Sequence, residues 1–282
     1  MAELINGKVV SEHLRAKISE EVFAFTKEYD RTPGLAVILV GEDPASMVYV
    51  RNKHKACLEV GIKSFEIRLP ADTSEDTLIA KIEQLNQNDE VNGILVQLPL
   101  PKHISEERVL NSILPIKDVD SFHPVNVGKL MLGKPDFLPC TPAGIMELLE
   151  YYSIDVSGRE CVVIGRSNIV GKPMAMLLLS LHGTVTVCHS RTANLSEITR
   201  RADILVVAIG RPNFVDASMV KEGAVVIDVG INRGADGKLV GDVDFASVEP
   251  IASCLTPVPG GVGPMTITML LKNTLNAAKK QI

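Results

Sequence analysis

A tyrosine and a lysine lie four residues apart in the segment YVRNK, a spacing that puts two side chains on one face of a helix. These residues are Tyr49 and Lys53. A lysine at the edge of a ligand site loses hydration, which lowers its pKa and suits it to proton transfer near neutral pH. Tyr49 is suited to stacking on an aromatic ligand. The alternative is an exposed basic helix, because Arg51, His54 and Lys55 are close by.

The segment GRSNIVGKPMA, which begins at Gly165, follows an apolar run and leads into an apolar helical pattern. A glycine-rich turn between a strand and a helix can hold phosphate. The triphosphate loop GxxxxGK[ST] is excluded, because five residues separate Gly165 from Gly171 and Lys172 is followed by Pro173. A dinucleotide site remains, in which the first glycine allows the tight turn and the second a close approach. Ser167 adds a hydroxyl. A plain strand-to-helix turn is the alternative.

The strand after this loop indicates which dinucleotide would bind. NAD sites carry an acidic residue about 20 residues after the glycine turn, where it bonds the ribose 2′-hydroxyl. No acidic residue occurs between Gly183 and Glu197. Basic and hydroxyl residues stand there instead: His189, Ser190 and Arg191, with Arg166 in the loop itself. This set favours a 2′-phosphate, and therefore NADP, unless the arginines are merely solvated.

Three more segments combine polar residues with strand ends or turns. Gln97 follows an apolar strand, at the end where ligands of open α/β sheets bind, although the strand also breaks at Pro99. Asp118 and Asp120 in KDVD precede a candidate domain junction, where aspartate also favours turns. The loop TPVPGGVGPMT (256–266) has three prolines and three glycines. It either offers its amides to a flat ligand or is a surface linker.

Composition excludes several classes of protein. The chain has 282 residues, 46% of them hydrophobic, and a net charge of −5 from 29 basic and 34 acidic residues. Without a basic block, nucleic acid is not an expected partner. No apolar window reaches the length of a membrane span, and the polar N-terminal segment shows no secretory signal. We therefore expect neither a membrane partner nor secretion.

Cysteine and histidine usage points to a cytoplasmic protein without a catalytic metal. The five cysteines are scattered and form no CxxC pair, which is typical of reduced, buried thiols in the cytoplasm. The six histidines show neither HxxxH nor HExxH spacing, so no metal site is predicted.

The apolar period alternates between strand and helix along the whole chain. After a helix capped by Ser11, the first half predicts alternating strands and helices at 35–41, 45–61, 64–70, 75–87, 93–100 and 105–113. The second half predicts strands at 160–165, 184–189, 203–209 and 224–229, with helices at 171–182 and 195–202. This order favours parallel sheets covered by helices on both faces.

The whole set of motifs resembles the bifunctional methylenetetrahydrofolate dehydrogenase/methenyltetrahydrofolate cyclohydrolase family in its short bacterial form. The resemblance runs essentially end to end, and the most specific segments are PGGVGPMT and QLPLP. The other matching segments, in family order, are GEDPASMVYVRNKHKA, KDVD, CTPAGI, GRSNIVGKPMA, CHSRT and DVGIN.

The resemblance implies two α/β domains flanking a cleft, the C-terminal one a Rossmann-like dinucleotide-binding domain. Residues 1–120, with a C-terminal helix at about 264–282, would form a folate-binding catalytic domain. Residues 140–263 would bind NADP, and 121–139 would join the two. The implied activity is NADP-dependent oxidation of 5,10-methylenetetrahydrofolate to the methenyl compound and its hydrolysis to 10-formyltetrahydrofolate, in a homodimer.

The resemblance also assigns site residues. It implies that Lys53 transfers protons in hydrolysis, that Gln97 positions it, and that Tyr49 lies against the folate's aromatic system. Asp120 would bind the pterin ring. The further substrate contacts would be Val96 and Leu98 with the loop Pro259, Gly260, Gly261, Val262 and Gly263. The NADP contacts would be Gly165, Arg166, Ser167, Ser190 and Ile231.

One position departs from the family pattern: Ser121 stands where glycine is common. If this position requires positive φ, serine is disfavoured there, and we expect a shifted loop and a changed pterin affinity. Two other functions fit parts of the sequence. A shikimate dehydrogenase-like NADP oxidoreductase, which would also use a lysine in the first domain, leaves PGGVGPMT and Tyr49 unexplained. The alternative from another class is a non-catalytic dinucleotide-sensing module.

Overall fold

The computed structural model describes residues 1–234 and 237–282, without the side chain of Ala45. The chain forms two compact units. The six-stranded unit contains Met1–Glu12 and Thr141–Thr266, and the three-stranded unit contains His13–Cys140 and Ile267–Ile282. None of the described helices is long and apolar enough to cross a membrane.

The sheet of the three-stranded unit is parallel, in the order β3-β2-β4. Its strands are β2 (Gly34–Val40), β3 (Lys63–Leu69) and β4 (Gly93–Val96). The central strand reads GLAVILV and is buried along its whole length. A continuous apolar strand of this kind is expected where helices cover both faces of a parallel sheet.

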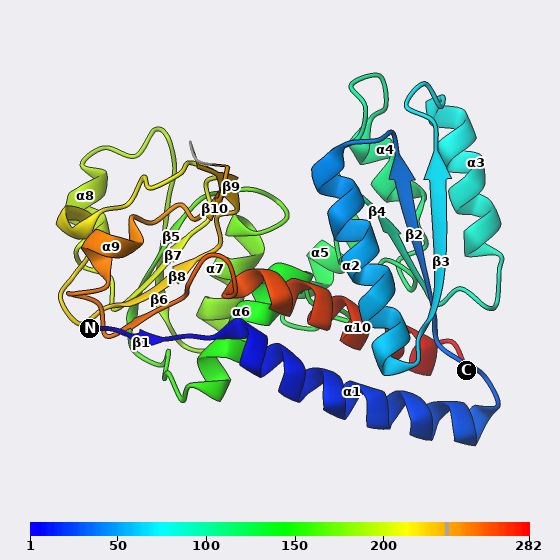
Figure 1. Ribbon diagram of the computed structural model, residues 1–282, viewed down its shortest axis with the longest axis horizontal. Helices are drawn as coiled ribbons and strands as arrows, with labels where there is room; N and C mark the ends of the chain where they lie inside the picture. The colour runs from blue at the N-terminus through cyan, green and yellow to red at the C-terminus, as the bar shows by residue number, and fades with distance from the viewer. Residues whose placement is uncertain (235–236) are drawn as a thin grey trace. The chain divides into compact units, whose positions relative to one another are not determined.

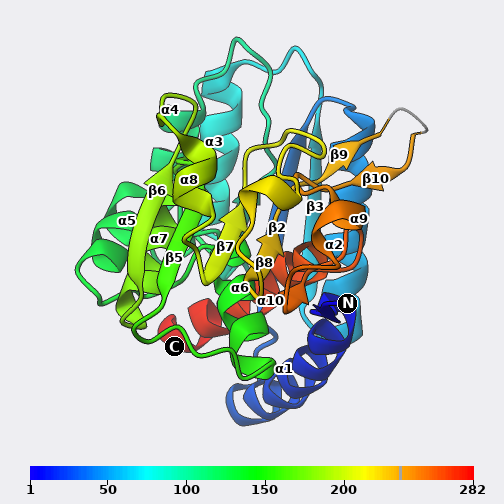
Figure 2. The same ribbon diagram turned by 90° about the vertical axis from the view of Figure 1, so that its left-hand side faces the viewer.

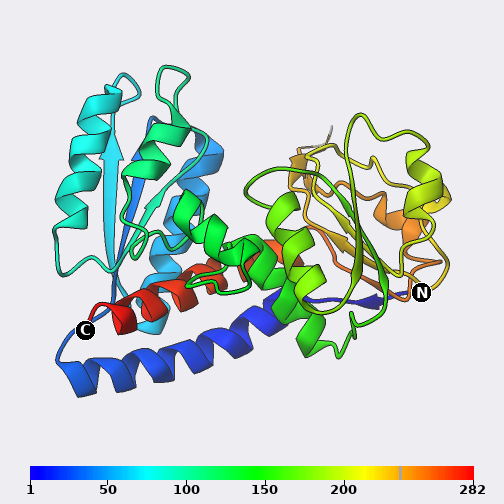
Figure 3. The same cartoon turned by 180° about the vertical axis from the view of Figure 1, so that it is seen from behind.

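Helices pack on both faces of this small sheet. Alternate side chains of β2, such as Ala36 and Ile38, share a core with α3 and α4. Figure 3 shows these two helices in front of the sheet. Figure 1, seen from the other side, shows α2 on the opposite face. The helices of this unit are α2 (Pro44–Val60), α3 (Glu75–Asn86), α4 (Glu106–Ser112) and α5 (Pro124–Met131), with most of α1 (Gly7–Tyr29) and α10 (Val262–Lys280).

The six-stranded sheet is also parallel throughout, in the order β1-β11-β8-β7-β5-β6. Figure 2 shows β6, β5, β7 and β8 side by side. The strands are β1 (Glu3–Leu4), β5 (Glu160–Ile164), β6 (Thr184–Cys188), β7 (Ile204–Val207), β8 (Val225–Asp228) and β11 (Cys254–Leu255).

Helices also cover the larger sheet. Residues of α8 and α9 pack with Val162, Leu205 and Val226 in one core, and α7 contacts β5 and β6. The remaining elements are α6 (Cys140–Tyr151), α7 (Gly171–Ser180), α8 (Leu195–Thr199), the 3-10 helix η1 (Ala217–Met219), α9 (Phe245–Val248), and the antiparallel pair β9 (Asn232–Arg233) and β10 (Leu239–Val240).

The predicted parallel α/β class is confirmed, and three local expectations need correction. The first is the start of the chain: β1 pairs with β11, so residues 1–12 belong to the six-stranded unit. The second is the first helix, which begins at Gly7 instead of Ser11, because the Asn6 side-chain oxygen accepts the amides of Lys8 and Val9. The third is the predicted junction at 121–139, which contains α5 and packs within the three-stranded unit.

Candidate active site

Helix α2 turns Lys53 toward the interior of the three-stranded unit. The helix begins where the Asp43 carboxylate accepts the Ser46 amide at 2.8 Å, and it ends at Gly61, which has a left-handed φ of 81°. Its buried stripe includes Val50, Cys57 and Val60. Lys53 lies in this stripe and is only 8% exposed. The hypothesis of an exposed basic helix is therefore wrong for this residue, although Lys55 is exposed.

Gln97 holds the lysine amine from the end of β4. Its backbone amide donates to Ile38 O at 2.8 Å, which continues the sheet pairing one residue past the strand. Its side-chain nitrogen donates to Leu98 O at 2.7 Å, so the amide oxygen Oε1 is turned to accept from Lys53 Nζ at 3.0 Å. The structure thus brings Lys53 and Gln97 into direct contact.

The surroundings of Lys53 favour its neutral form. Burial lowers the pKa of the amine below its ordinary value, and the carboxylate of half-buried Asp120 opposes this in part. Burial also raises the pKa of Tyr49, which is half-buried one turn before the lysine. An amine with a lowered pKa exchanges protons with water more readily near neutral pH. The cluster of Lys53, Gln97 and Asp120 can therefore support acid and base catalysis.

Two buried thiols share the lysine's environment and were not predicted as site residues. Burial raises the pKa of Cys57 to about 12, and that of Cys140 well above its ordinary value, so both remain protonated at neutral pH. The Cys140 thiol donates to Val119 O at 3.4 Å. Cys57 is four residues after Lys53, a spacing that could have indicated its position, whereas Cys140 is distant in sequence and gives no local signal.

Val96 and Leu98 flank Gln97 but point into the core. Val96 is 4% exposed and belongs to the cluster that α3 and α4 form on the sheet, and Leu98 packs against the same cluster. Alternate side chains of a strand point to opposite faces, so these two lie on the face away from that of Gln97. Their role as substrate contacts stays a prediction.

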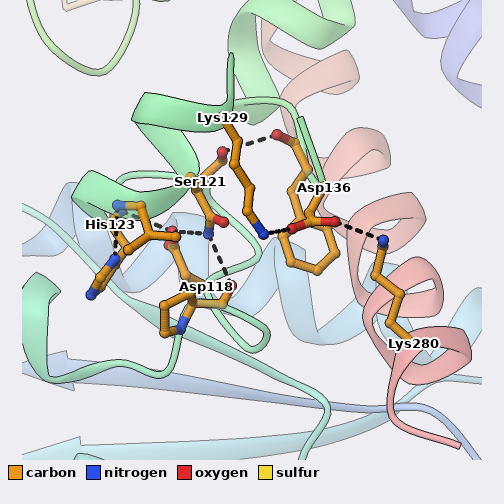
Figure 4. Close-up of polar contacts among 10 residues, drawn as sticks. Asp118, Ser121, His123, Lys129, Asp136 and Lys280 are labelled. Atoms are coloured by element: carbon orange, nitrogen blue, oxygen red, sulfur yellow. Dashed lines mark hydrogen bonds and ion pairs between the residues drawn. The ribbon is translucent and has the colours of Figure 1, made fainter. Parts of the chain in front are cut away.

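The two acidic residues of KDVD have different roles. Asp118 is buried, and its carboxylate accepts the amides of Phe122 and His123 and the side chain of Asn126, at 2.8 to 3.2 Å. Figure 4 shows this group at the start of α5. Asp118 therefore fixes the turn that carries Asp120, which is the acidic residue that acts electrostatically on Lys53.

Ser121 has the backbone conformation that glycine favours. Its φ is 61°, and it is fully buried. Its hydroxyl donates to Phe137 O at 3.0 Å, next to Asp136, which pairs with Lys129 and Lys280 (Figure 4). The position thus has positive φ, as the family's glycine suggests, and serine offsets the strain with a buried hydrogen bond. An effect on pterin affinity stays a prediction.

Replacement of Ser121 by alanine is expected to lower the free energy of unfolding by about 1–3 kcal/mol, because the buried Phe137 carbonyl loses its donor. Replacement by glycine loses the same bond but removes the left-handed strain of about 1–2 kcal/mol, so its stability should stay near wild type. Urea denaturation measures both. Ser153→Ala is the matched control, because Ser153 also has positive φ but is exposed. Equal stability of Ser121→Ala and wild type would contradict the role of the hydrogen bond.

In the six-stranded unit, the glycine turn joins β5 to α7 with very close backbone packing. Gly165 has a φ of 130°, and a Cβ there would lie 2.3 Å from Ala208 O. A Cβ on Gly171 would lie 2.3 Å from Gly165 O. The Ser167 hydroxyl accepts the amides of Val170 and Gly171, both at 3.2 Å. Only glycine fits at both ends of this turn.

The turn after β6 presents the residues expected to select the dinucleotide. The His189 amide donates to Thr192 Oγ1 at 2.8 Å, and the Thr192 amide donates to His189 O at 2.9 Å. This closed turn leaves Ser190 and Arg191 exposed, as is Arg166 in the glycine turn. Because β5 and β6 are adjacent and parallel, both turns lie at the same edge of the sheet.

The proline- and glycine-rich loop is anchored in the same unit and is not a free linker. The Lys8 amide donates to Gly260 O at 3.2 Å, and a Cβ on Gly7 would lie 1.8 Å from Gly261 O. A Cβ on Gly263 would lie 3.6 Å from Ile231 Cδ1. The structure therefore brings Ile231, a predicted cofactor contact, beside the loop of Pro259–Gly263, a predicted substrate contact.

These residues fit a dinucleotide with a 2′-phosphate. The first turn of α7 contains no acidic residue, and the two glycines allow a phosphate to approach the backbone. Arginine and hydroxyl groups are exposed at the adjacent turn, where an NAD site would carry a carboxylate. Among the described residues, no three side chains of His, Cys, Asp or Glu are grouped to hold a metal ion. The fold and these sites define a two-unit α/β enzyme with a Rossmann-like dinucleotide unit.

Comparison with known proteins identifies the family. The model described as tetrahydrofolate dehydrogenase/cyclohydrolase, catalytic domain, matches residues 5–120, and the NAD(P)-binding domain of the same family matches residues 139–282. The bifunctional protein FolD of Acetivibrio thermocellus is 62% identical over 99% of this chain and 98% of its own. The chain belongs to the tetrahydrofolate dehydrogenase/cyclohydrolase family.

Solved structures agree with this assignment. The bifunctional FolD methylenetetrahydrofolate dehydrogenase/cyclohydrolase of Campylobacter jejuni is 52% identical, with a TM-score of 0.97 and full coverage of both chains. The Trypanosoma brucei enzyme complexed with NADP and an inhibitor is 41% identical, with a TM-score of 0.95 and coverage of 99% and 98%. Shikimate dehydrogenase from Aquifex aeolicus is 13% identical with a TM-score of 0.50, a likeness of fold alone. The family prediction is confirmed over that alternative.

Proposed function

We propose that this protein oxidises 5,10-methylenetetrahydrofolate with NADP to 5,10-methenyltetrahydrofolate and hydrolyses that product to 10-formyltetrahydrofolate. The observation that carries the proposal is the buried amine of Lys53, held by Gln97, in a chain whose second part matches the family's NAD(P)-binding domain. The activity belongs to one-carbon metabolism, where the formyl product serves purine biosynthesis.

The oxidation needs positioning more than proton transfer. A bound NADP, held at the glycine turn of Gly165–Gly171 and the turn after β6, would supply the acceptor for a hydride from the methylene carbon of the folate. No proton moves in this step, so the protein contributes mainly by holding the two reactants in line. We assign Tyr49 to stacking on the folate and Asp120 to binding its pterin ring. The loop Pro259–Gly263 completes the substrate contacts that we propose, whereas the side chains of Val96 and Leu98 point into the core.

The hydrolysis needs a proton carrier. Water attacks the amidine-like methenyl carbon and loses a proton, after which the bond from this carbon to a ring nitrogen breaks and the nitrogen takes up a proton. We assign both transfers to Lys53, whose lowered pKa suits it to exchange. Gln97 keeps the amine in place through its oxygen. That Lys53 and the dinucleotide serve one bound folate stays a prediction.

The cofactor contacts we propose are Gly165, Arg166, Ser167, Ser190 and Ile231. Two arginines and no carboxylate at the adjacent turns support a preference for the 2′-phosphate of NADP.

The test is an absorbance assay with methylenetetrahydrofolate and either NADP or NAD, run side by side. The methenyl signal should grow and then decay, faster with NADP than with NAD. Growth without decay would leave a dehydrogenase alone, and the absence of any signal would overturn the proposal.

We further infer a homodimer in the cytoplasm. The resemblance to the family supports the dimer, and the free cysteines, four of them buried, support a reducing compartment. Sedimentation of the purified protein tests the dimer, and a monomer at micromolar concentration would contradict it.

A further inference from the structure

Two buried carboxylates at the carboxyl edge of the six-stranded sheet are not used by the proposed reaction. Asp242 is fully buried, and Asp228, the last residue of β8, is 3% exposed. Buried carboxylates are costly unless their oxygens are fully hydrogen-bonded. Every oxygen of the two carboxylates accepts at least one hydrogen bond, and the donors are backbone amides of the loops at this edge together with the side chain of Asn232.

The Asp242 carboxylate forms hydrogen bonds to two of these loops, the one after β7 and the one after β8. Its Oδ2 accepts the amides of Ile209 and Gly210 at 2.7 and 2.9 Å. Its Oδ1 accepts the amide of Arg211 at 2.8 Å and the side-chain nitrogen of Asn232 at 2.9 Å. Three consecutive amides after β7 and the residue after Ile231 are thus held by one side chain.

The Asp228 carboxylate holds the backbone of Asp242 in place. Its Oδ1 accepts the amides of Gly230 and Asp242, and its Oδ2 accepts the amide of Val243, all at 2.9 Å. Burial raises the pKa of Asp228 to about 6, so it is mostly ionised at neutral pH and able to accept all three. A Cβ on Gly230 would lie 2.3 Å from Asp242 Oδ1, so only glycine fits against the carboxylate at this position.

The loops that Asp242 holds border the residues assigned to the cofactor. Ile231 lies between Gly230 and Asn232, both of which bond to the pair. On the other side, Ala208 precedes the three bound amides and packs against Gly165 of the glycine turn. Relaxing these bonds would move both loops at the sheet edge where the dinucleotide is assigned.

We propose that Asp242, supported by Asp228, is a positioning residue that shapes the loops after β7 and β8 for the dinucleotide. The inference rests on the proposed function, because it needs NADP to bind at this edge. Asp242 does not itself contact the cofactor. It acts through the backbone on either side of Ile231 and through the loop that packs on Gly165.

The substitution Asp242→Asn tests this with little change in shape. Each oxygen of Asp242 accepts two N–H groups. The side-chain nitrogen of asparagine is a donor, so in either position it would face two other donors and lose both hydrogen bonds. We expect NADP affinity, measured by calorimetry, to fall at least about tenfold and the KM for NADP to rise. Hydrolysis of supplied methenyltetrahydrofolate, which uses no dinucleotide, should stay within about threefold of wild type. This split separates positioning from general loss of structure.

Two further variants complete the test. Asp244→Asn is the matched control, since the Asp244 side chain makes no capping bond to α9, and it should bind NADP like wild type. If Asp242→Asn does not fold, Asn232→Ala decides, because it removes one bond to Asp242 and should weaken NADP binding while hydrolysis persists. Wild-type NADP affinity in the folded variant overturns the positioning role alone. Wild-type protein that binds no NADP overturns the proposed function and this inference with it.

Discussion

Replacing Lys53 by methionine is expected to abolish hydrolysis of methenyltetrahydrofolate while oxidation of methylenetetrahydrofolate persists. General acid and base catalysis contributes about 100- to 10,000-fold to a rate, and Lys53 is the amine assigned to both proton transfers. Hydride transfer moves no proton, so its rate should fall only as far as folate binding weakens. The measurement follows the decay of supplied methenyltetrahydrofolate and, separately, NADPH formation.

Methionine is a suitable replacement because its unbranched side chain fills a similar volume in the buried stripe of α2. It leaves the Gln97 amide without its donor but removes a costly buried amine. The matched control is Lys55→Met, two residues further on the same helix, where the side chain is exposed and pairs with Glu59 at 3.8 Å. Equal hydrolysis by Lys53→Met and wild type would remove Lys53 from the mechanism.

The burial of Lys53 could have been predicted from its neighbours. Val50, Cys57 and Val60 recur at helical spacing on either side of it, so the lysine interrupts an apolar stripe and must point inward with them. The count of nearby basic residues obscured this pattern, because Arg51 and Lys55 occupy other faces of the helix.

Other parts of the site could not be found from local sequence. Cys140 reaches the lysine's surroundings, and Asp242 reaches the loops after β7 and β8, only through tertiary folding. Short strands raise the same difficulty. β1 has two residues, and only its pairing with Cys254 and Leu255 defines it as a strand. The parallel order was predictable because long apolar runs alternate with long helices.

Replacing Gly171 by alanine is expected to weaken NADP binding at least about tenfold and to destabilise the protein, against the usual preference of helices for alanine. Helix propensity alone predicts a gain of about 0.5–1 kcal/mol. However, the new Cβ would lie 2.3 Å from Gly165 O and 2.7 Å from Arg166 N. These are backbone atoms of the turn itself, so the turn must open, at a cost of about 1–3 kcal/mol typical of overpacking.

Gly128→Ala provides the comparison that separates these two effects. Gly128 lies inside α5, and a Cβ there meets no atom within 4 Å, so alanine should leave stability unchanged or raise it. Thermal unfolding and NADP titration of both variants measure the difference, and hydrolysis without dinucleotide reports whether the three-stranded unit is intact. Wild-type stability and NADP affinity in Gly171→Ala would mean that close packing of the turn is not what prepares it for phosphate. If both fall while hydrolysis persists, the contact between Gly165 and Gly171 is what makes this turn a dinucleotide site.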